Sequence, residues 1–342
     1  MITFSLGVGN IVTIHDIAKQ LGINSSTVSR ALSGRAGVSE ELRAKILARA
    51  EELGYRPNLM ARYLRQQSSN VIGLVMDEEF NWYISTLAQG VQSAAKELGF
   101  SVMIWNAPEI ENQKAGLELF EQLRLAGVIL ASSYVSNRNP YLKSSLPTVC
   151  INRTEVHDTI NFVHDDEHGA VLGILHLISL GHKRIGFING PSDWSPSISR
   201  YRGVKHALSS AGLDFDEALY ACGDWFRDSA YREAIRMLSL PDRPTAIFAA
   251  NDLMAVGVYQ AARELGLDIP HELSVLGYND DPLCTYLVPE LTTIDLANKD
   301  IGYQAAKTLF SQFTENTESC GPTAVKGELI VRGSTHQAPR SI

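Results

Sequence analysis

From residue 71 to residue 331, short apolar runs alternate with amphipathic helical patterns, and this alternation restricts the fold more than any other feature. Runs such as VIGLVM at 71–76 and GVILA at 127–131 have the length and composition of buried strands. Strands that alternate with helices form parallel sheets with helices on both faces. The region is too long for one open sheet of this kind. We therefore expect an α/β core of two doubly wound parallel-sheet subdomains.

The elements of this core can be placed by hydrophobic pattern and turn residues. Expected strands lie at 71–76, 101–105, 127–131, 147–151, 184–189, 218–222, 245–250, 274–278, 291–295 and 327–331. Expected helices lie at 84–98, 114–125, 169–180, 199–211, 229–238, 252–265 and 299–313.

Residues 13–65 have a different pattern, with three short amphipathic helices in succession. Thr13, with Asp16 three residues later, can cap the first helix, and Gly22 can end it. Asn24 or Ser25 can begin the second. The apolar positions of the three helices are Ile14, Ile17, Ala18 and Leu21, then Val28, Ala31 and Leu32, then Leu42, Ile46 and Leu53. Two helices joined by a tight turn, with a third completing a small core, describe an all-α helix-turn-helix domain.

The second of these helices presents short hydroxyls and one arginine on its exposed side. Such side chains can bond phosphates or base edges without blocking entry to a major groove. Nine Lys and Arg against five Asp and Glu give 13–65 a net charge of +4, although the whole chain carries −8. A basic head on an acidic body fits phosphate contact at one end only. The alternative is an ordinary three-helix unit attached to an enzyme.

The motifs make the interpretation more specific. TIHDIAKQLGINSSTVSRAL at 13–32 and YRPNLMARYL at 55–64 resemble the DNA-binding head of the lac-repressor/galactose-repressor (LacI/GalR) family. LGHKRIGFINGP at 180–191, AANDLMAVG at 249–257 and LGYND at 276–280 extend the resemblance over nearly the whole chain. The resemblance implies a sequence-specific transcription regulator, in most members a repressor. A small ligand in the cleft between two periplasmic-binding-protein-like subdomains would control its operator affinity.

The resemblance also implies a domain plan. Residues 1–12 would be a disordered leader, 13–57 the helix-turn-helix domain, and 58–68 a hinge helix and linker. Residues 69–335 would form the effector-binding and dimerisation core, with residues 336–342 as a tail. The N-subdomain would comprise about 69–164 plus 295–325, and the C-subdomain about 165–294 plus 326–334. The short tail lacks leucine heptads, which favours a homodimer over a tail-mediated tetramer.

Contacts to double-stranded operator DNA follow from the same resemblance. Arg30 with Ser25 and Ser26 would read base edges, and Leu64 would be the wedge that opens the minor groove. By pattern alone, the alternative for 58–65 is a linker with some helical tendency. The full set of expected DNA-binding residues is Thr13, Asn24, Ser25, Ser26, Thr27, Ser29, Arg30, Asn58, Ala61 and Leu64.

Polar and aromatic residues follow several of the expected strands, where a cleft ligand would meet them. A Trp beside acids and amides suits a carbohydrate, because the indole stacks on C–H faces while polar groups take hydroxyls. The expected effector-binding residues are Asp77, Asn81, Tyr83, Arg200, Trp225, Asn251 and Asn279. Trp225 is alternatively a packed loop aromatic. Asn279 stands where many relatives have Asp, and Trp82 where a proline is common. These departures leave a purine or other metabolite, or an aryl glycoside, as alternatives.

Other functions lack a sequence basis. The four cysteines are scattered and form no CxxC pair, which suggests buried free thiols in a reducing cytoplasm. His164 and His168 have i, i+4 metal-ligand spacing, but they stand where a strand gives way to a helix, so we expect no metal and no cofactor. No G-x-S-x-G or P-loop motif supports an enzyme. No apolar run is long enough for a membrane span, and no signal peptide supports a transport-type sugar-binding protein.

Overall fold

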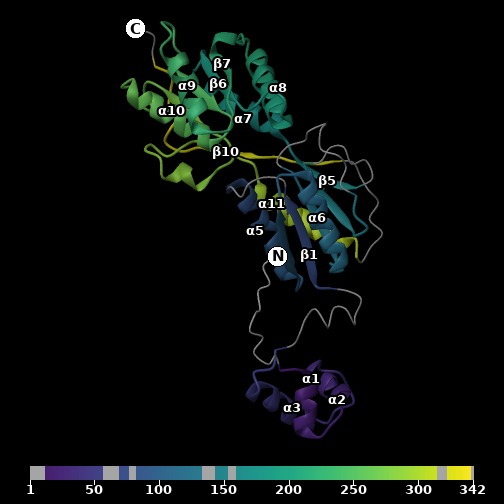
Figure 1. Cartoon of the computed structure of the whole chain (residues 1–342). Helices are drawn as coiled ribbons and strands as arrows, with labels where there is room; N and C mark the ends of the chain where they lie inside the picture. Colours follow the sequence, from purple (N-terminus) through teal and green to yellow (C-terminus); the bar gives the residue numbers. More distant parts are fainter. Residues whose placement is uncertain are drawn as a thin grey trace, which may run out of the picture. The chain divides into compact units, whose positions relative to one another are not determined.

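The computed structural model describes residues 12–56, 69–76, 82–132, 143–152, 159–313 and 322–339. They fall into two compact units, the head within residues 1–67 and the core within 68–342 (Figure 1). None of the described helices is both long and apolar enough to cross a membrane.

The head contains the three expected helices, α1 (Ile14–Leu21), α2 (Ser25–Leu32) and α3 (Glu40–Glu52). Their small core is built on Ile17, Val28 and Ile46, each fully buried. Asp16 accepts hydrogen bonds from both the backbone nitrogen and the hydroxyl of Thr13, at 2.8 and 2.7 Å, which fixes the start of α1. Gly22 ends α1 in the left-handed conformation (φ 66°), as expected for a helix C-terminus. The helix-turn-helix prediction is confirmed.

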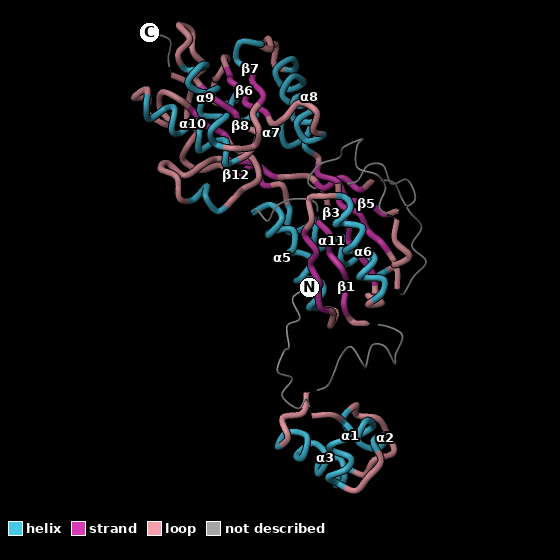
Figure 2. Tube along the Cα trace, viewed as in Figure 1, coloured by secondary structure: helices cyan, strands magenta, loops and turns pink. Residues whose placement is uncertain are grey.

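The first sheet of the core has six parallel strands in the order β11-β5-β4-β3-β1-β2. Its strands are β1 (Val71–Met76), β2 (Ser101–Asn106), β3 (Gly127–Ala131), β4 (Thr148–Ile151), β5 (Ile160–His164) and β11 (Thr323–Val325). Helices α5 (Trp82–Glu97) and α11 (Asn298–Ser311) share one hydrophobic cluster with this sheet, and α6 (Ile110–Gln122) shares another. The helices therefore cover both faces of the sheet (Figure 2).

The second sheet has four parallel strands in the order β7-β6-β8-β9. Its strands are β6 (Ile185–Asn189), β7 (Tyr220–Cys222), β8 (Ala246–Ala249) and β9 (Ser274–Leu276). One hydrophobic cluster joins it to α7 (Asp166–Ser179) and α8 (Ser195–Ser210), and another joins it to α9 (Arg227–Leu238) and α10 (Asp252–Glu264). The prediction of two doubly wound parallel-sheet subdomains is confirmed.

The two sheets are connected where β5 leads into α7, and again through the antiparallel pair β10 (Thr293–Asp295) and β12 (Glu328–Ile330). β10 is followed by α11 of the first sheet, and β12 comes after β11. Beyond β12 the chain stays bound to the second sheet. His336 N donates to Ser274 Oγ at 3.0 Å, and Ala338 N donates to Leu180 O at 2.8 Å. These two residues of the expected tail are thus held by the core.

Two strands were not expected from the sequence. β5 carries polar Asn161 and His164, which interrupt its apolar run, and β11 is a three-residue edge strand without a buried face. Neither therefore shows the hydrophobic pattern of a buried strand. Several helices also start earlier than expected, such as α6 at Ile110 and α8 at Ser195, because their first turns are polar or contain proline.

Candidate functional site

The expected recognition helix is α2, and its polar side chains are available to a ligand to different degrees. Ser26 and Arg30 are exposed, whereas Ser25, Thr27 and Ser29 are half-buried. Ser25 Oγ lies 2.9 Å from His15 Nδ1, which holds this hydroxyl against α1. The remaining expected contacts of the described head, Thr13 and Asn24, are exposed just before α1 and α2.

Five of the expected site residues lie outside the described residues. They are the hinge residues Asn58, Ala61 and Leu64 and the effector candidates Asp77 and Asn81.

In the core, Arg200 of α8 is the centre of a buried polar cluster. Its Nε and Nη2 lie 2.9 and 2.8 Å from Asp166 Oδ1, and its Nη1 donates to Ala250 O. The guanidinium carbon stands 3.8 Å from the ring centroid of Tyr278 and 5.5 Å from that of Trp225. Burial alone would lower the pKa of Arg200, but Asp166 and Tyr278 outweigh burial and raise it. Arg200 is therefore a fixed, fully ionised group, already matched by one carboxylate.

Trp225 and Asn251 are bound to each other at the carboxyl ends of β7 and β8. Trp225 adopts φ 72°, and its indole packs so closely on Gly190 that a Cβ there would lie 2.2 Å from the ring. Asn251 Nδ2 donates to Trp225 O at 3.0 Å, while Asn251 Oδ1 accepts from Met254 N at 2.7 Å and caps α10. Both polar groups of Asn251 are thus used to position Trp225 and α10. Trp225 Nε1 is shielded from solvent and has no hydrogen-bond partner among the described residues.

Tyr83 of α5 is connected to the same cluster by Asn152 and His164, neither of which was among the expected effector-binding residues. Asn152 Nδ2 donates to Tyr83 OH at 2.9 Å, and the Asn152 amide also lies 3.0–3.2 Å from His164 Nδ1. Burial lowers the pKa of His164 to about 4, although the negative charge of Asp166 opposes this shift. Asn152 directly follows an expected strand, as the other candidates do, so the same rule could have identified it.

His164 and its neighbours, considered above for metal binding, have separate partners. Asp165 Oδ1 accepts from His168 N at 3.0 Å and caps α7, while Asp166 binds Arg200. The described residues contain no group of three or more potential metal ligands.

Asn279 stands in the loop after β9, directly after Tyr278. Its φ of 114° is in the left-handed half of conformational space, and its backbone nitrogen donates to Ile294 O at 2.7 Å. Together with Trp82 it lines a pocket of about 320 Å³ between the loop after β9 and the first turns of α5 and α11. Asp280, Asp295 and Asp300 contribute carboxylates to this pocket.

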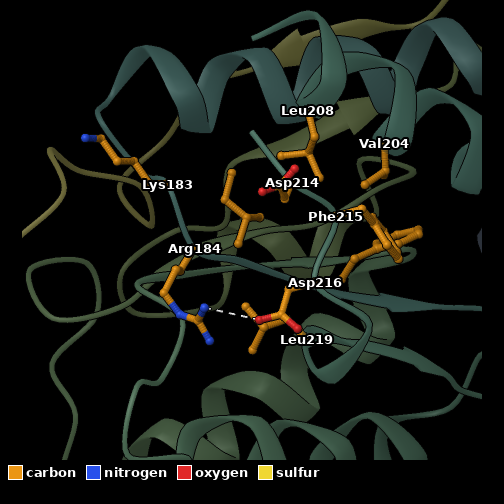
Figure 3. Close-up of a pocket in the computed structure, with 10 residues that line it drawn as sticks. Lys183, Arg184, Val204, Leu208, Asp214, Phe215, Asp216 and Leu219 are labelled. Atoms are coloured by element: carbon orange, nitrogen blue, oxygen red, sulfur yellow. Dashed lines mark ion pairs between the residues drawn. The ribbon is translucent and has the colours of Figure 1, made fainter. Parts of the chain in front are cut away.

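A further pocket, of about 330 Å³, lies at the amino end of β6 (Figure 3). Buried side chains such as Phe187 and Leu208 form its floor, and Arg184 at its rim lies 3.1 Å from Asp216. It belongs to the end of the second sheet opposite to the carboxyl ends that carry Trp225 and Asn251.

Comparison with known proteins extends these observations. Residues 13–58 match the model of bacterial regulatory proteins of the lacI family, and residues 174–335 match a periplasmic binding protein-like domain. The ribose operon repressor of Escherichia coli (strain K12) is 32% identical over 95% of this chain and 100% of its own length. The HTH-type transcriptional repressor PurR of Proteus mirabilis is 29% identical over 96% of this chain and 98% of its own length. A crystal structure of the Lac repressor dimer bound to operator and the anti-inducer ONPF superposes with a TM-score of 0.84, at 27% identity over 95% and 99% of the two chains. The helix-turn-helix head, the two parallel-sheet subdomains and these matches together show that the chain belongs to the LacI family of DNA-binding transcription regulators.

Proposed function

We propose that a neutral, hydroxyl-rich small molecule, a sugar or glycoside, controls the operator affinity of this repressor by binding at the Arg200 cluster. The observation that carries the proposal is the pairing of Arg200 with Asp166 at 2.8 Å. Because the guanidinium is already matched, a phosphate or carboxylate on the ligand would gain little from it, and hydroxyls can share the pair instead.

Further features of the cluster support a polyol. The faces of Trp225 and Tyr278 flank Arg200, and an indole face suits the C–H surface of a sugar ring. Ser197 Oγ, three residues before Arg200 on α8, is buried without a hydrogen-bond partner among the described residues, like Trp225 Nε1. Buried donors and acceptors without partners are costly, and ligand hydroxyls would satisfy them.

A thermal-shift screen tests the proposal with neutral sugars and glycosides, such as ribose and cellobiose, against their phosphorylated forms and against purine bases. Of these compounds, we expect only the neutral sugars and glycosides to raise the melting temperature of the protein. A Trp225→Leu variant should need at least about tenfold more ligand for the same rise in melting temperature, because the aromatic stacking face is gone. Trp105→Leu is the matched control, since Trp105 lies in the edge strand β2 of the first sheet and packs on Gly116 of α6.

The principal alternative is a purine-responsive regulator, and one observation favours it. Exposed Trp82 offers an aromatic face in the pocket that contains Asn279. Stabilisation by purine bases, lost in Trp82→Ala and kept in Trp225→Leu, would replace the sugar proposal by this one.

We also propose the remaining partners. Two copies of the chain would present two α2 helices to the half-sites of a pseudo-palindromic operator in the cytoplasm. Four exposed apolar side chains of the second subdomain suit a dimer interface, namely Phe226, Leu253, Tyr286 and Val288. Tyr259 OH donates to Pro289 O at 2.7 Å, which fixes the loop carrying Tyr286 and Val288 to α10. In the proposed complex Arg30 reads base edges from α2, and Leu64 acts as the minor-groove wedge.

A further inference from the structure

The charged residues of the head are distributed unevenly among its helices. Residues 17–39, which include the end of α1, all of α2 and the turn after it, contain three cations and no acidic residue. By contrast, α3 carries four glutamates. The positive field of the head is therefore concentrated around α2 and the turn that follows it.

Of the seven Lys and Arg in residues 12–56, three have a hydrogen-bonded or ion-paired partner there, among them Arg43, which donates to a backbone carbonyl. Lys45 lies 2.8 Å from Glu41, and Arg49 lies 2.5 Å from Glu52. Lys19 forms no ion pair among the described residues, although its charge helps to lower the pKa of the Asp16 carboxyl, after hydrogen bonds from Thr13 and the charge of His15.

Like Arg56 at the end of the described head, Arg30 and Arg35 pair with no acidic side chain among the described residues. Both are exposed. They are also linked, since Arg35 N donates to Arg30 O at 3.0 Å.

The backbone at Arg35 is held from a second side. Arg43 Nη2, from α3, donates to the carbonyl oxygen of Arg35 at 2.7 Å. Gly34 and Gly37 on either side adopt φ of 69° and 95°, which only glycine enters without strain. Because the backbone is already fixed, only the arginine side chain has to be ordered when the cation binds an anion.

We propose that Arg35 is a phosphate-binding residue of the DNA interface, adjoining the site where Arg30 reaches base edges. A guanidinium can donate two parallel hydrogen bonds to two phosphate oxygens. The turn that carries Arg35 adjoins the end of α2, because Arg35 N donates a hydrogen bond to Arg30 O. A phosphate contact adds affinity on every sequence and carries no base preference. The inference rests on DNA binding through α2.

The salt dependence of binding tests the proposal with the full chain. Fluorescence anisotropy would measure the affinity for a random-sequence duplex at several salt concentrations. Arg35→Gln should reduce the slope of log K against log salt by about 0.9 per subunit. The resulting loss of affinity should be about threefold greater at 50 mM than at 200 mM salt for each subunit. Arg35→Lys keeps the charge and should restore the slope.

Lys45→Gln is the matched control, because Lys45 is an exposed cation of the same head that is already paired with Glu41. Its slope should equal that of the unmodified protein. A second duplex, selected by the unmodified protein from a random library, separates phosphate from base contact. Arg35→Gln should weaken binding to both duplexes by the same factor, whereas Arg30→Ala should weaken the selected duplex more.

An unchanged slope in Arg35→Gln, no recovery in Arg35→Lys, or a loss confined to the selected duplex would each overturn the assignment of Arg35. If the unmodified protein bound neither duplex, DNA binding itself would fail, which is a distinguishable result. Equal melting temperatures of the variants would show that the head remains folded.

Discussion

Arg200 and His164 show how burial decides what a titratable side chain can do. Arg200 is 5% exposed and keeps its charge, because Asp166 lies 2.8 Å away and Tyr278 stacks on it. Burial favours the neutral form of His164 and lowers its pKa, and the positive charge of Arg200 adds to this effect against the negative charge of Asp166. Within one cluster, therefore, the arginine is held charged and the histidine is held neutral.

The pH dependence of stability should reveal the neutral His164. Its folded pKa of about 4 lies below the ordinary value of 6.5, so between these values the unfolded chain binds a proton that the folded chain does not. Proton uptake by His164 therefore favours the unfolded chain, so the free energy of unfolding falls as the pH is lowered from 6.5 towards 4, and this effect is absent above pH 6.5. We expect His164→Gln to flatten the profile in this window by on the order of 2 kcal/mol.

Urea unfolding followed by tryptophan fluorescence between pH 4.5 and 7.5 checks this prediction. Burial also lowers the pKa of His176 and His182, so both proteins should lose some stability in acid. The decisive quantity is the difference between the two profiles. Parallel profiles would show that His164 titrates normally in the folded protein.

At the scale of elements, glycines set how closely the helices of the first subdomain approach. A Cβ at Gly90 of α5 would lie 2.0 Å from the carbonyl oxygen of Lys299, and one at Gly302 of α11 would lie 2.3 Å from that of Leu87. The obstacles are backbone atoms, which cannot turn aside as a side chain can. The contact between α5 and α11 therefore depends on the absence of side chains at both positions.

Gly90→Ala should lower the free energy of unfolding by about 1–3 kcal/mol through overpacking. Alanine has the higher helix propensity, by about 1 kcal/mol, so a net loss would show that packing outweighs propensity. Chemical denaturation measures the effect. Gln92→Ala, at an exposed position of the same helix, should change stability by no more than about 0.5 kcal/mol. A stabilising Gly90→Ala would contradict the close packing.

At the scale of the whole molecule, exposed apolar side chains gather where the loop after β9 and the 3₁₀ helix Pro282–Thr285 pack beside α10. Tyr286 and Val288 are 80% and 90% exposed, although the backbone of their loop is fixed by Tyr259. Exposed apolar side chains that form a contiguous patch mark interaction sites, whereas singly scattered ones do not. A second copy of the chain is the proposed partner.

A charge at Tyr286 should therefore disrupt the proposed dimer. We expect Tyr286→Asp to raise the dimer dissociation constant by at least a hundredfold, on the order of 3 kcal/mol, as for a truncated interface anchor. Analytical ultracentrifugation measures the dissociation constant. Leu175→Asp is the control, because Leu175 is another exposed apolar residue, on α7. Equal weakening by both variants would indicate a general loss of stability instead.

The sequence by itself determined the class of protein. The period of the apolar residues indicated three helices followed by alternating strands and helices, because each face that is to be buried must repeat at the period of its element. The motifs TIHDIA and AANDLMAVG indicated the family. Strands such as β5 and β11 were missed, since their stability comes from neighbouring strands and not from an apolar pattern of their own.

Only the tertiary structure decided what the polar residues do. Arg200 and Asn251 were predicted to contact an effector, and the structure adds partners that the sequence did not indicate: Arg200 pairs with Asp166, and Asn251 holds Trp225 and caps α10. Tyr83, Asn152 and His164 meet although 69 positions separate the first two. Hydrogen bonding, burial and pKa depend on contacts between residues that are distant along the chain. A pattern of nearest neighbours does not contain that information.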